Sequence, residues 1–439
     1  MRVPQWLALQ LLLGLSLTCS VTVQSQEPPP EQAAQQEEQQ DDPGEETRVA
    51  ALLDDDSTNE MHDDTTILRN VEVLDDRGLE LFGALRIWLG GAVQYDYYNI
   101  EGIFRSTSNG DELDEVGFRR LDGILRAQLF DWGEVKVQYD FDRGIFRDLY
   151  LRWVSDRPET PVTITIGEQK EPMSLEHLTG NKFEMAQERS APGDAFGRWR
   201  SSGLRLHKAF SLDPEKRLFD YFEEDTAFVT TSVGVFTQDI EERHDTDVAV
   251  TGRITAGRDS EGVGVHIGLS SSYREGDYNR ISFRPEVNEA DRIVLARPDA
   301  NTQGIFAAEA AYNHGRLHVQ GEAFYSEYRG RENAYGGGGY AQAGWFLTTD
   351  ARRYNPRWGI QAPLRPSGRY AAELLARFSV TRADTSGTDW NNYMALTLGA
   401  NVTYRNLKAS LNTIYGTSRD PIGGEDEGLA LVLRAQYIF

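Results

Sequence analysis

The sequence holds one cysteine, Cys19, among 439 residues. A chain this poor in cysteine has no disulfide framework, and sites built from several cysteines are excluded. Long apolar runs are also scarce. The most apolar stretch, residues 6–17, has the length of a signal-peptide core and is too short to cross a bilayer as a helix. A helical membrane protein is therefore not expected.

The first residues fix the expected compartment. Arg2 is followed by the apolar stretch and then by small and polar residues, which predicts a signal peptide over residues 1–25 with cleavage between residues 20 and 25. Cys19 has two interpretations. It could carry a lipid, although Ser16 stands where a lipoprotein signal has an aliphatic residue. The favoured interpretation is that Cys19 leaves with the signal peptide.

Positive charge is in deficit, with 45 Lys and Arg against 69 Asp and Glu. A protein with this excess of negative charge does not attract nucleic acid, so we expect no nucleic-acid partner. The acids concentrate early, because residues 27–80 hold 18 of them against three arginines. We predict that residues 26–80 form a Gln/Glu/Pro-rich periplasmic linker, mostly disordered. It could act as a spacer or tether. Its "DDDSTNE" run lacks the glycine and spacing of a calcium loop, and no motif predicts a cofactor or metal.

The remaining residues, 81–439, are patterned as strands. In "EVKVQYDFD", residues 134–142, apolar and polar side chains alternate, and "RLHVQGEAFY", residues 316–325, does the same. Such a period of two predicts strands with one apolar and one polar face. In the second segment we expect Leu317, Val319 and Tyr325 to face lipid and His318, Gln320 and Glu322 to face water.

Sixteen segments of this kind can be counted, separated by connections rich in Gly, Asp, Asn and Pro. They centre near residues 91, 124, 138, 150, 164, 205, 232, 252, 268, 308, 322, 343, 376, 398, 411 and 434. A soluble sandwich or propeller is one option, but it rarely needs strands this long. An even number of ten-residue strands, apolar outside and polar inside, is typical of a membrane barrel. The end of the chain, "LALVLRAQYIF", reads as its closing strand, with Phe439 in an aromatic girdle.

Three stretches carry a resemblance to a family. "VGFRRLDGILRAQLFDWGEVKVQYDFDRG", "GEQKEPMSLEHLTGNKFEMAQERS" and the C-terminal strand resemble the phosphate-selective porin O and P family of bacterial outer membranes. The second stretch, G-x-x-K-x-P-x-S-L-E-x-L-T followed by E-R-S, is the most specific. The resemblance implies a sixteen-stranded antiparallel transmembrane β-barrel. It also implies a homotrimer in contact with outer-membrane lipid, and one loop folded into the channel as a constriction.

Residues 167–200 are the best candidate for that inward loop. They interrupt the alternation with three dozen charged and apolar residues, and an ordinary exposed loop is the alternative. We expect a short helical turn capped by Ser174. The loop and the strand phases together predict a channel site for anions, since rings of Arg and Lys favour anions and Arg can bind two phosphate oxygens at once. Its predicted residues are Arg119 and Arg120, which the resemblance places at the narrow part of the channel, together with Arg126, Lys136, Arg152, His177, Lys182, Arg198 and Arg200.

Two positions depart from the family's phosphate-specific members. Ala92 stands where the resemblance would place an arginine, and His177 stands near the place of a lysine. Alanine carries no charge and histidine is mostly neutral near pH 7. We therefore expect weaker phosphate binding than in those members.

These observations predict an outer-membrane porin with a water-filled channel for passive diffusion of small solutes and a mild preference for anions such as phosphate. A general diffusion porin and a structural barrel that anchors the envelope remain alternatives. No hydrolase or nucleotide-binding motif is present, and we expect no enzyme activity. "GGGG" at residues 336–339 is interpreted as a flexible loop rather than a phosphate cradle.

Overall fold

A computed structural model describes residues 79–81, 85–108, 111–129, 132–155, 162–212, 226–237, 245–260, 262–364, 366–385, 391–420 and 424–439. The predicted signal peptide and nearly all of the predicted linker lie outside the described residues. Within them, no helix combines the length and the apolar character needed to cross a membrane.

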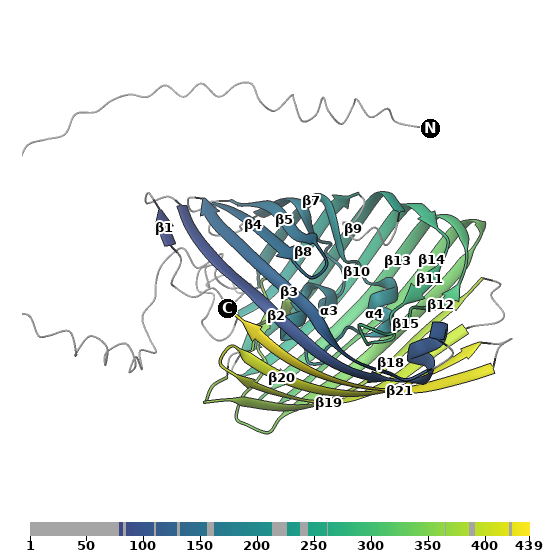
Figure 1. Cartoon of the computed structure of the whole chain (residues 1–439). Helices are drawn as coiled ribbons and strands as arrows, with labels where there is room; N and C mark the ends of the chain where they lie inside the picture. The colour runs from purple at the N-terminus through teal and green to yellow at the C-terminus, as the bar shows by residue number, and fades with distance from the viewer. Residues whose placement is uncertain are drawn as a thin grey trace, which may run out of the picture. The chain divides into compact units, whose positions relative to one another are not determined.

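Sixteen strands close into one antiparallel barrel (Figure 1). They are β2 (Leu85–Ile100), β3 (Leu113–Leu129), β4 (Gly133–Asp140), β5 (Ile145–Val154), β6 (Val162–Lys170), β7 (Arg200–Ser211), β8 (Thr226–Phe236), β9 (Asp245–Ser260), β10 (Val263–Tyr278), β13 (Asp299–His314), β14 (Leu317–Glu332), β15 (Ala334–Phe346), β18 (Ala371–Asp384), β19 (Asn391–Tyr404), β20 (Leu407–Asp420) and β21 (Gly424–Ile438). Each contains one of the sixteen predicted centres, so the predicted barrel is confirmed.

The barrel closes between its first and last strands. β2 pairs with β21 from Ala92 to Ile100, and the backbone of Phe439 exchanges hydrogen bonds with Gly91 at 2.8 and 3.2 Å. A short strand, β1 (Leu79–Leu81), pairs with the start of β2. Closure gives each of the sixteen described barrel strands a neighbour on both sides, so the barrel presents no open edge to lipid.

Alternation along the strands follows the predicted phase. Val319 and Tyr325 are exposed on the outer surface, whereas His318, Gln320 and Glu322 are buried in the lumen. The outer surface carries large apolar side chains throughout, for example Leu269 at 61% exposure. Asp142, the last polar residue of the alternating segment 134–142, does not face the lumen as the alternation predicts. It lies in the exposed turn after β4, which ends at Asp140.

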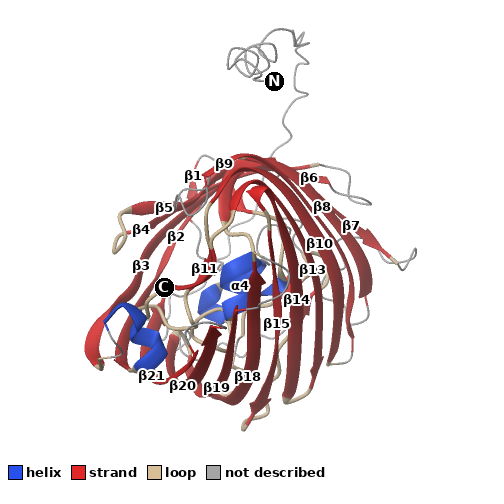
Figure 2. Cartoon of the chain, turned by 90° about the vertical axis from the view of Figure 1, so that its right-hand side faces the viewer, coloured by secondary structure: helices blue, strands red, loops and turns tan. Residues whose placement is uncertain are grey.

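Three segments between strands enter the barrel (Figure 2). The first is residues 171–199, with α3 (Leu175–Leu178), the 3-10 turn η3 (Asn181–Phe183) and α4 (Ala191–Phe196). The second holds the hairpin β11 (Ile281–Phe283) and β12 (Ile293–Ala296). The third, residues 347–370, holds β16 (Tyr354–Asn355) and β17 (Ile360–Gln361). Residues 171–199 confirm the predicted inward loop.

The first two segments build an apolar core inside one end of the barrel. Phe196 of α4 and Phe283 of β11 are fully buried in it, together with Phe104 from the 3-10 segment η2 (Gly102–Ser108). Both segments therefore pack together with η2 at the same end of the barrel. The opposite side of the inward loop is polar, and its residues Asn181 and Lys182 line a cavity in the barrel.

The interpretation of residues 336–339 as a flexible loop was wrong. All four glycines lie within β15 and pair with both β14 and β18. A Cβ on Gly336 would come within 2.7 Å of the Phe196 ring, and one on Gly338 would lie 3.0 Å from Pro192. Gly336 and Gly338 therefore make a bare stretch of wall on which α4 packs.

Candidate functional site

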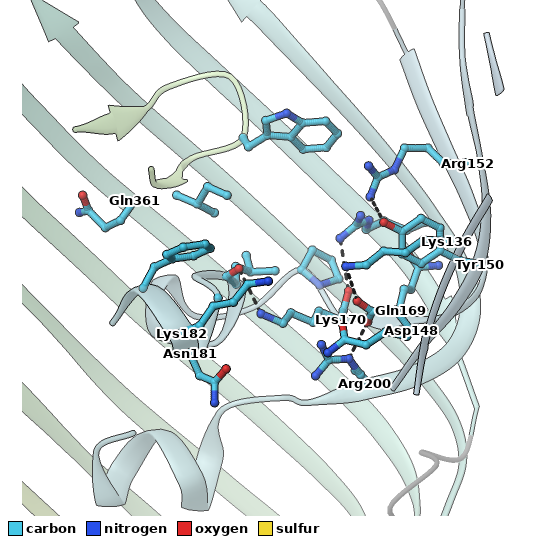
Figure 3. A pocket seen from close by; sticks show the side chains of 18 of the residues that line it. Lys136, Asp148, Tyr150, Arg152, Gln169, Lys170, Asn181, Lys182, Arg200 and Gln361 are labelled. Atoms are coloured by element: carbon cyan, nitrogen blue, oxygen red, sulfur yellow. Dashed lines mark hydrogen bonds and ion pairs between the residues drawn. The ribbon is translucent and has the colours of Figure 1, made fainter. Parts of the chain in front are cut away.

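A cavity of about 140 Å³ lies between the barrel wall and the inward segments. That is room for about five water molecules. Of the described residues that line it, ten are basic and two, Asp122 and Asp148, are acidic. Figure 3 shows wall residues such as Lys136 and Arg152 facing Lys182 of the inward loop across the open space. The ten basic residues are Arg120, Arg126, Lys136, Arg152, Lys170, Lys182, Arg189, Arg200, Arg205 and Arg253.

Strand register places the wall residues side by side. Arg120 and Arg126 share the lumen face of β3, because six residues separate them and the side-chain period is two. Arg126 is directly opposite Lys136 of β4, and Lys136 is opposite Tyr150 of β5. The result is a row of charged and aromatic side chains across three strands.

A β-bulge adds Arg119 to this face. Gln94 of β2 pairs with Arg120 and Tyr95 pairs with Phe118, so Arg119 has no partner in the register. Both arginines are consequently buried in the lumen, at 6% and 5% exposure. Alternation alone would send consecutive side chains to opposite faces, and a bulge is the local device that redirects one of them.

A second bulge repeats this on β5. Gln138 of β4 pairs with Asp148 and Tyr139 pairs with Phe146, which leaves Arg147 outside the register. Arg147 is buried and binds Asp140 at 2.7 Å. The two bulges each bring one extra arginine into the lumen near the inward loop.

Ion pairs hold most of the cavity cations in place. Asp148 binds Lys136 at 2.7 Å and Arg200 at 2.6 Å, and Glu134 binds Arg126 and Arg152. In total, seven of the ten cations share five carboxylates, the others being Asp122, Glu184 and Glu309. Positive charge therefore remains in excess after pairing.

Lys170 and Arg205 are different from these seven. Among the described residues, neither has a carboxylate within ion-pair distance. The Lys170 ammonium donates hydrogen bonds to the carbonyls of Leu178 and Thr179, at 3.3 and 3.1 Å. Arg205 donates to the Lys170 carbonyl at 3.3 Å. Both side chains line the cavity, where they can donate hydrogen bonds to an anion.

The inward loop begins just after the point at which the side-chain alternation of β6 stops. Gly167 has φ of 120°, a conformation that side chains rarely adopt, and Glu168 and Gln169 after it are both buried. The predicted cap is confirmed, because the Ser174 hydroxyl accepts the N–H of His177 at 3.2 Å. Glu322 of β14 then accepts the N–H groups of Leu175 and Glu176, which anchors α3 to the opposite wall.

Two loop carboxylates have displaced pKa values. Burial alone would raise the pKa of Glu188, but Arg119 and Arg434 bind it at 2.6 and 2.7 Å and hold that pKa well below its usual range. Burial raises the pKa of Glu176 to about 8, although Arg377 is close, and the nearby Glu184 adds to the rise. Glu188 is therefore an anion that links the loop to the wall, whereas burial favours the protonated form of Glu176.

A second, smaller cavity adjoins the first. Arg120 and Arg189 line both, so the two cavities meet at these side chains. The smaller one is also lined by Arg119, Glu188 and residues 284–288 of the second inward segment. A solute moving between the two cavities would have to pass Arg120 and Arg189.

The structure sorts the nine predicted residues into three groups. Six line the larger cavity: Arg120, Arg126, Lys136, Arg152, Lys182 and Arg200. Arg119 lines the smaller cavity and binds Glu188.

His177 and Arg198 line neither described cavity. The His177 ring lies 4.9 Å from the Trp199 ring, edge to face, and a Cβ on Gly197 would touch it at 2.4 Å. Arg198 is buried at 3% exposure. Its pKa is lowered by burial and by the neighbouring Arg274. These two side chains belong to the packing of the inward loop against the wall.

Several lining residues were absent from the predicted site. Arg205 and Arg253 could have been found, because each lies on the polar face of an alternating segment. Lys170 and Arg189 belong to the K and E-R-S positions of the loop motif. Trp358 and its neighbours in residues 347–370 had no signal, since nothing in their pattern shows that this connection folds inward.

Comparisons with known proteins agree with this architecture. Residues 87–439 match the family model described as phosphate-selective porin O and P. None of the curated proteins matches the chain.

Solved structures with a similar fold are outer-membrane proteins. OmpT of Vibrio cholerae has a TM-score of 0.53 at 10% identity, covering 83% of this chain and 100% of its own. The outer-membrane channel DcaP of Acinetobacter baumannii has a TM-score of 0.52 at 12% identity, covering 82% and 99%. An anion-selective porin from Comamonas acidovorans has a TM-score of 0.49 at 10% identity, covering 81% and 100%. At these identities the first two likenesses concern the fold alone.

Proposed function

The chain belongs to the phosphate-selective porin O and P family, as an outer-membrane porin, and we propose that it passes small anions through the basic cavity beside its inward loop. Passage is passive, and the solutes are small oxyanions such as phosphate. The observation that carries the proposal is the lining of the larger cavity, with ten basic residues against two acids.

Electrostatics favours anions in this cavity. The barrel residues carry an excess of acids overall, 51 against 41 for residues 81–439, so net charge does not drive selectivity. The local excess does, because a basic ring beside low-dielectric walls attracts anions and repels cations. Lys170 and Arg205, which have no carboxylate partner among the described residues, offer the cavity donors that no ion pair occupies.

The channel should have only a mild preference for phosphate. Seven of the lining cations are occupied by carboxylates of the chain itself, and the ligand has to compete with these carboxylates or share their cations. His177, which would have to contribute a charge near the family's lysine position, packs against Trp199 instead. A modest affinity follows, with transport rather than capture as the outcome.

Assembly and processing complete the proposal. We propose a homotrimer in outer-membrane lipid, as the family resemblance implies, with the signal peptide removed and residues 26–80 left as a periplasmic linker. No catalytic role is proposed, since the fold and family are those of a channel.

Planar-bilayer recording tests the function. The purified protein should give steady single-channel steps in potassium chloride, and added phosphate should reduce the chloride current in a saturable way. A channel that conducts steadily but shows no phosphate block would be a general diffusion porin. A protein that inserts without conducting would be an anchoring barrel.

A further inference from the structure

Apolar side chains line one side of the basic cavity. Leu178 and Phe183 come from the inward loop, and Trp358 and Pro363 come from residues 347–370. All four are only half-buried, although they lie inside the barrel. The cavity therefore has a basic side, contributed mainly by strands β3 to β7, and an apolar side contributed by the two segments.

The apolar side is continuous. Leu178 and Trp358 pack against a small buried cluster of Leu175, Ala311 and Ile360. The buried cluster is enough to join the two segments to each other and to β13. The faces of Leu178 and Trp358 that remain open to the cavity add apolar surface in a wet lumen, which is unfavourable unless something covers it.

Trp358 is held rigidly in its position. Its ring stacks on His207 with 4.6 Å between centroids and 14° between planes. The next residue, Gly359, has φ of 62°, and its carbonyl accepts a hydrogen bond from Arg253 at 2.6 Å. A fixed aromatic face loses little conformational entropy when a ligand binds on it.

The basic and aromatic sides meet at Arg152. Its guanidinium carbon lies 4.8 Å from the centre of the Tyr150 ring and 5.3 Å from that of Trp358. Lys170, without a carboxylate partner, lines the same cavity. One small molecule could therefore place an acidic group on the basic side and an adjoining flat apolar group on the aromatic side.

We propose that this cavity takes an organic anion, in which a compact acidic headgroup is joined to a flat apolar body. The inference rests on the proposed anion channel and deepens it. The headgroup binds on the basic side at Lys170 and Arg205, and the apolar body lies against Trp358 and Leu178. Inorganic phosphate uses only the first of these surfaces, because it has no apolar face to cover the second.

Matched phosphate esters test the proposal by block of the chloride current. Phenyl phosphate and methyl phosphate carry the same headgroup and charge and differ in the apolar body. In the wild-type channel phenyl phosphate should block at a concentration about three- to tenfold lower than methyl phosphate, the usual scale of an aromatic contact. Trp358→Ala should bring the two esters within about twofold of each other, whereas Trp358→Phe should keep most of the difference.

Control measurements distinguish a failure of this inference from a failure of the proposed anion channel. Trp345→Ala removes an outward, half-exposed tryptophan of β15 and should change nothing. Block by inorganic phosphate should survive in Trp358→Ala. Equal block by the two esters in the wild-type channel overturns the inference and leaves the anion channel standing. An equal loss of ester block and phosphate block in Trp358→Ala also overturns the inference. Trp358 would then only support the folded segment and would not bind the apolar body. Absence of any phosphate block overturns the proposed function itself.

Discussion

Replacing Arg120 with alanine should weaken phosphate binding more than the loss of one charge suggests. Arg120 is buried, lines both cavities and lies 3.3 Å from Asp122. Without it, Asp122 keeps only its hydrogen bond from Gln138 at 2.9 Å. The variant therefore removes a positive charge and also leaves a carboxylate facing the route.

The size follows from Coulomb's law. Two unit charges 4 Å apart interact by about 1 kcal/mol in bulk water and by about 4 kcal/mol at an effective dielectric constant of 20. The lumen is wet, so the lower value is the safer guide for each of the two charges. A loss of about 1 kcal/mol corresponds to about a fivefold change in binding. The half-blocking phosphate concentration should rise by about fivefold or more.

Chloride current measured against phosphate concentration gives the result, at low ionic strength because 1 M salt screens charges beyond about 3 Å. Asp122→Asn should shift the half-blocking concentration the opposite way. Arg329→Ala, at an exposed arginine paired with Glu327, is the matched control and should have no effect. If Arg120→Ala leaves phosphate block unchanged while the protein conducts normally, the anion route does not pass Arg120.

Four further outcomes are expected. Glu188→Gln should lower the free energy of unfolding by about 3 kcal/mol, seen as a lower melting temperature in detergent, because buried Arg119 loses its carboxylate and Arg434 retains only its pair with Asp96 among the described residues. Leu396→Arg, on the lipid face of β19, should cost about 2–4 kcal/mol in the same assay. The pKa of Glu176 is about 8, so its contribution to stability should be complete below the ordinary pKa of a glutamate and lost as pH rises through 8. Glu176→Gln should remove this fall in stability, which spans the pH range from the ordinary pKa of a glutamate to about 8, and an unchanged pH profile would contradict the assignment. Deleting residues 27–80 should leave barrel assembly intact, as heat-modifiable migration of the folded form would show.

Sequence patterns predict the strands well because the membrane enforces them. Lipid on one face and water on the other impose a period of two on every strand. Val319 and His318 could therefore be assigned to opposite faces from the sequence alone. Closure could be predicted from the aromatic last residue, and the Ser174 cap from a local rule that needs no tertiary information.

The site was less predictable because its determinants are not periodic. A bulge brings Arg119 into the lumen beside Arg120, and alternation cannot foresee a bulge. The glycines of β15 look like a loop in sequence, yet they are strand because α4 needs a bare wall. The inward course of residues 347–370 depends on contacts such as Trp358 with His207, which join positions 151 residues apart.

The zero-current potential of the wild-type channel tests the central claim most directly. A tenfold potassium chloride gradient across a bilayer gives a potential whose sign reports which ion permeates better. An anion-preferring channel, as the basic cavity requires, should shift this potential toward the equilibrium potential of chloride, and the shift should shrink as total salt rises. A shift toward the potassium potential would contradict the account.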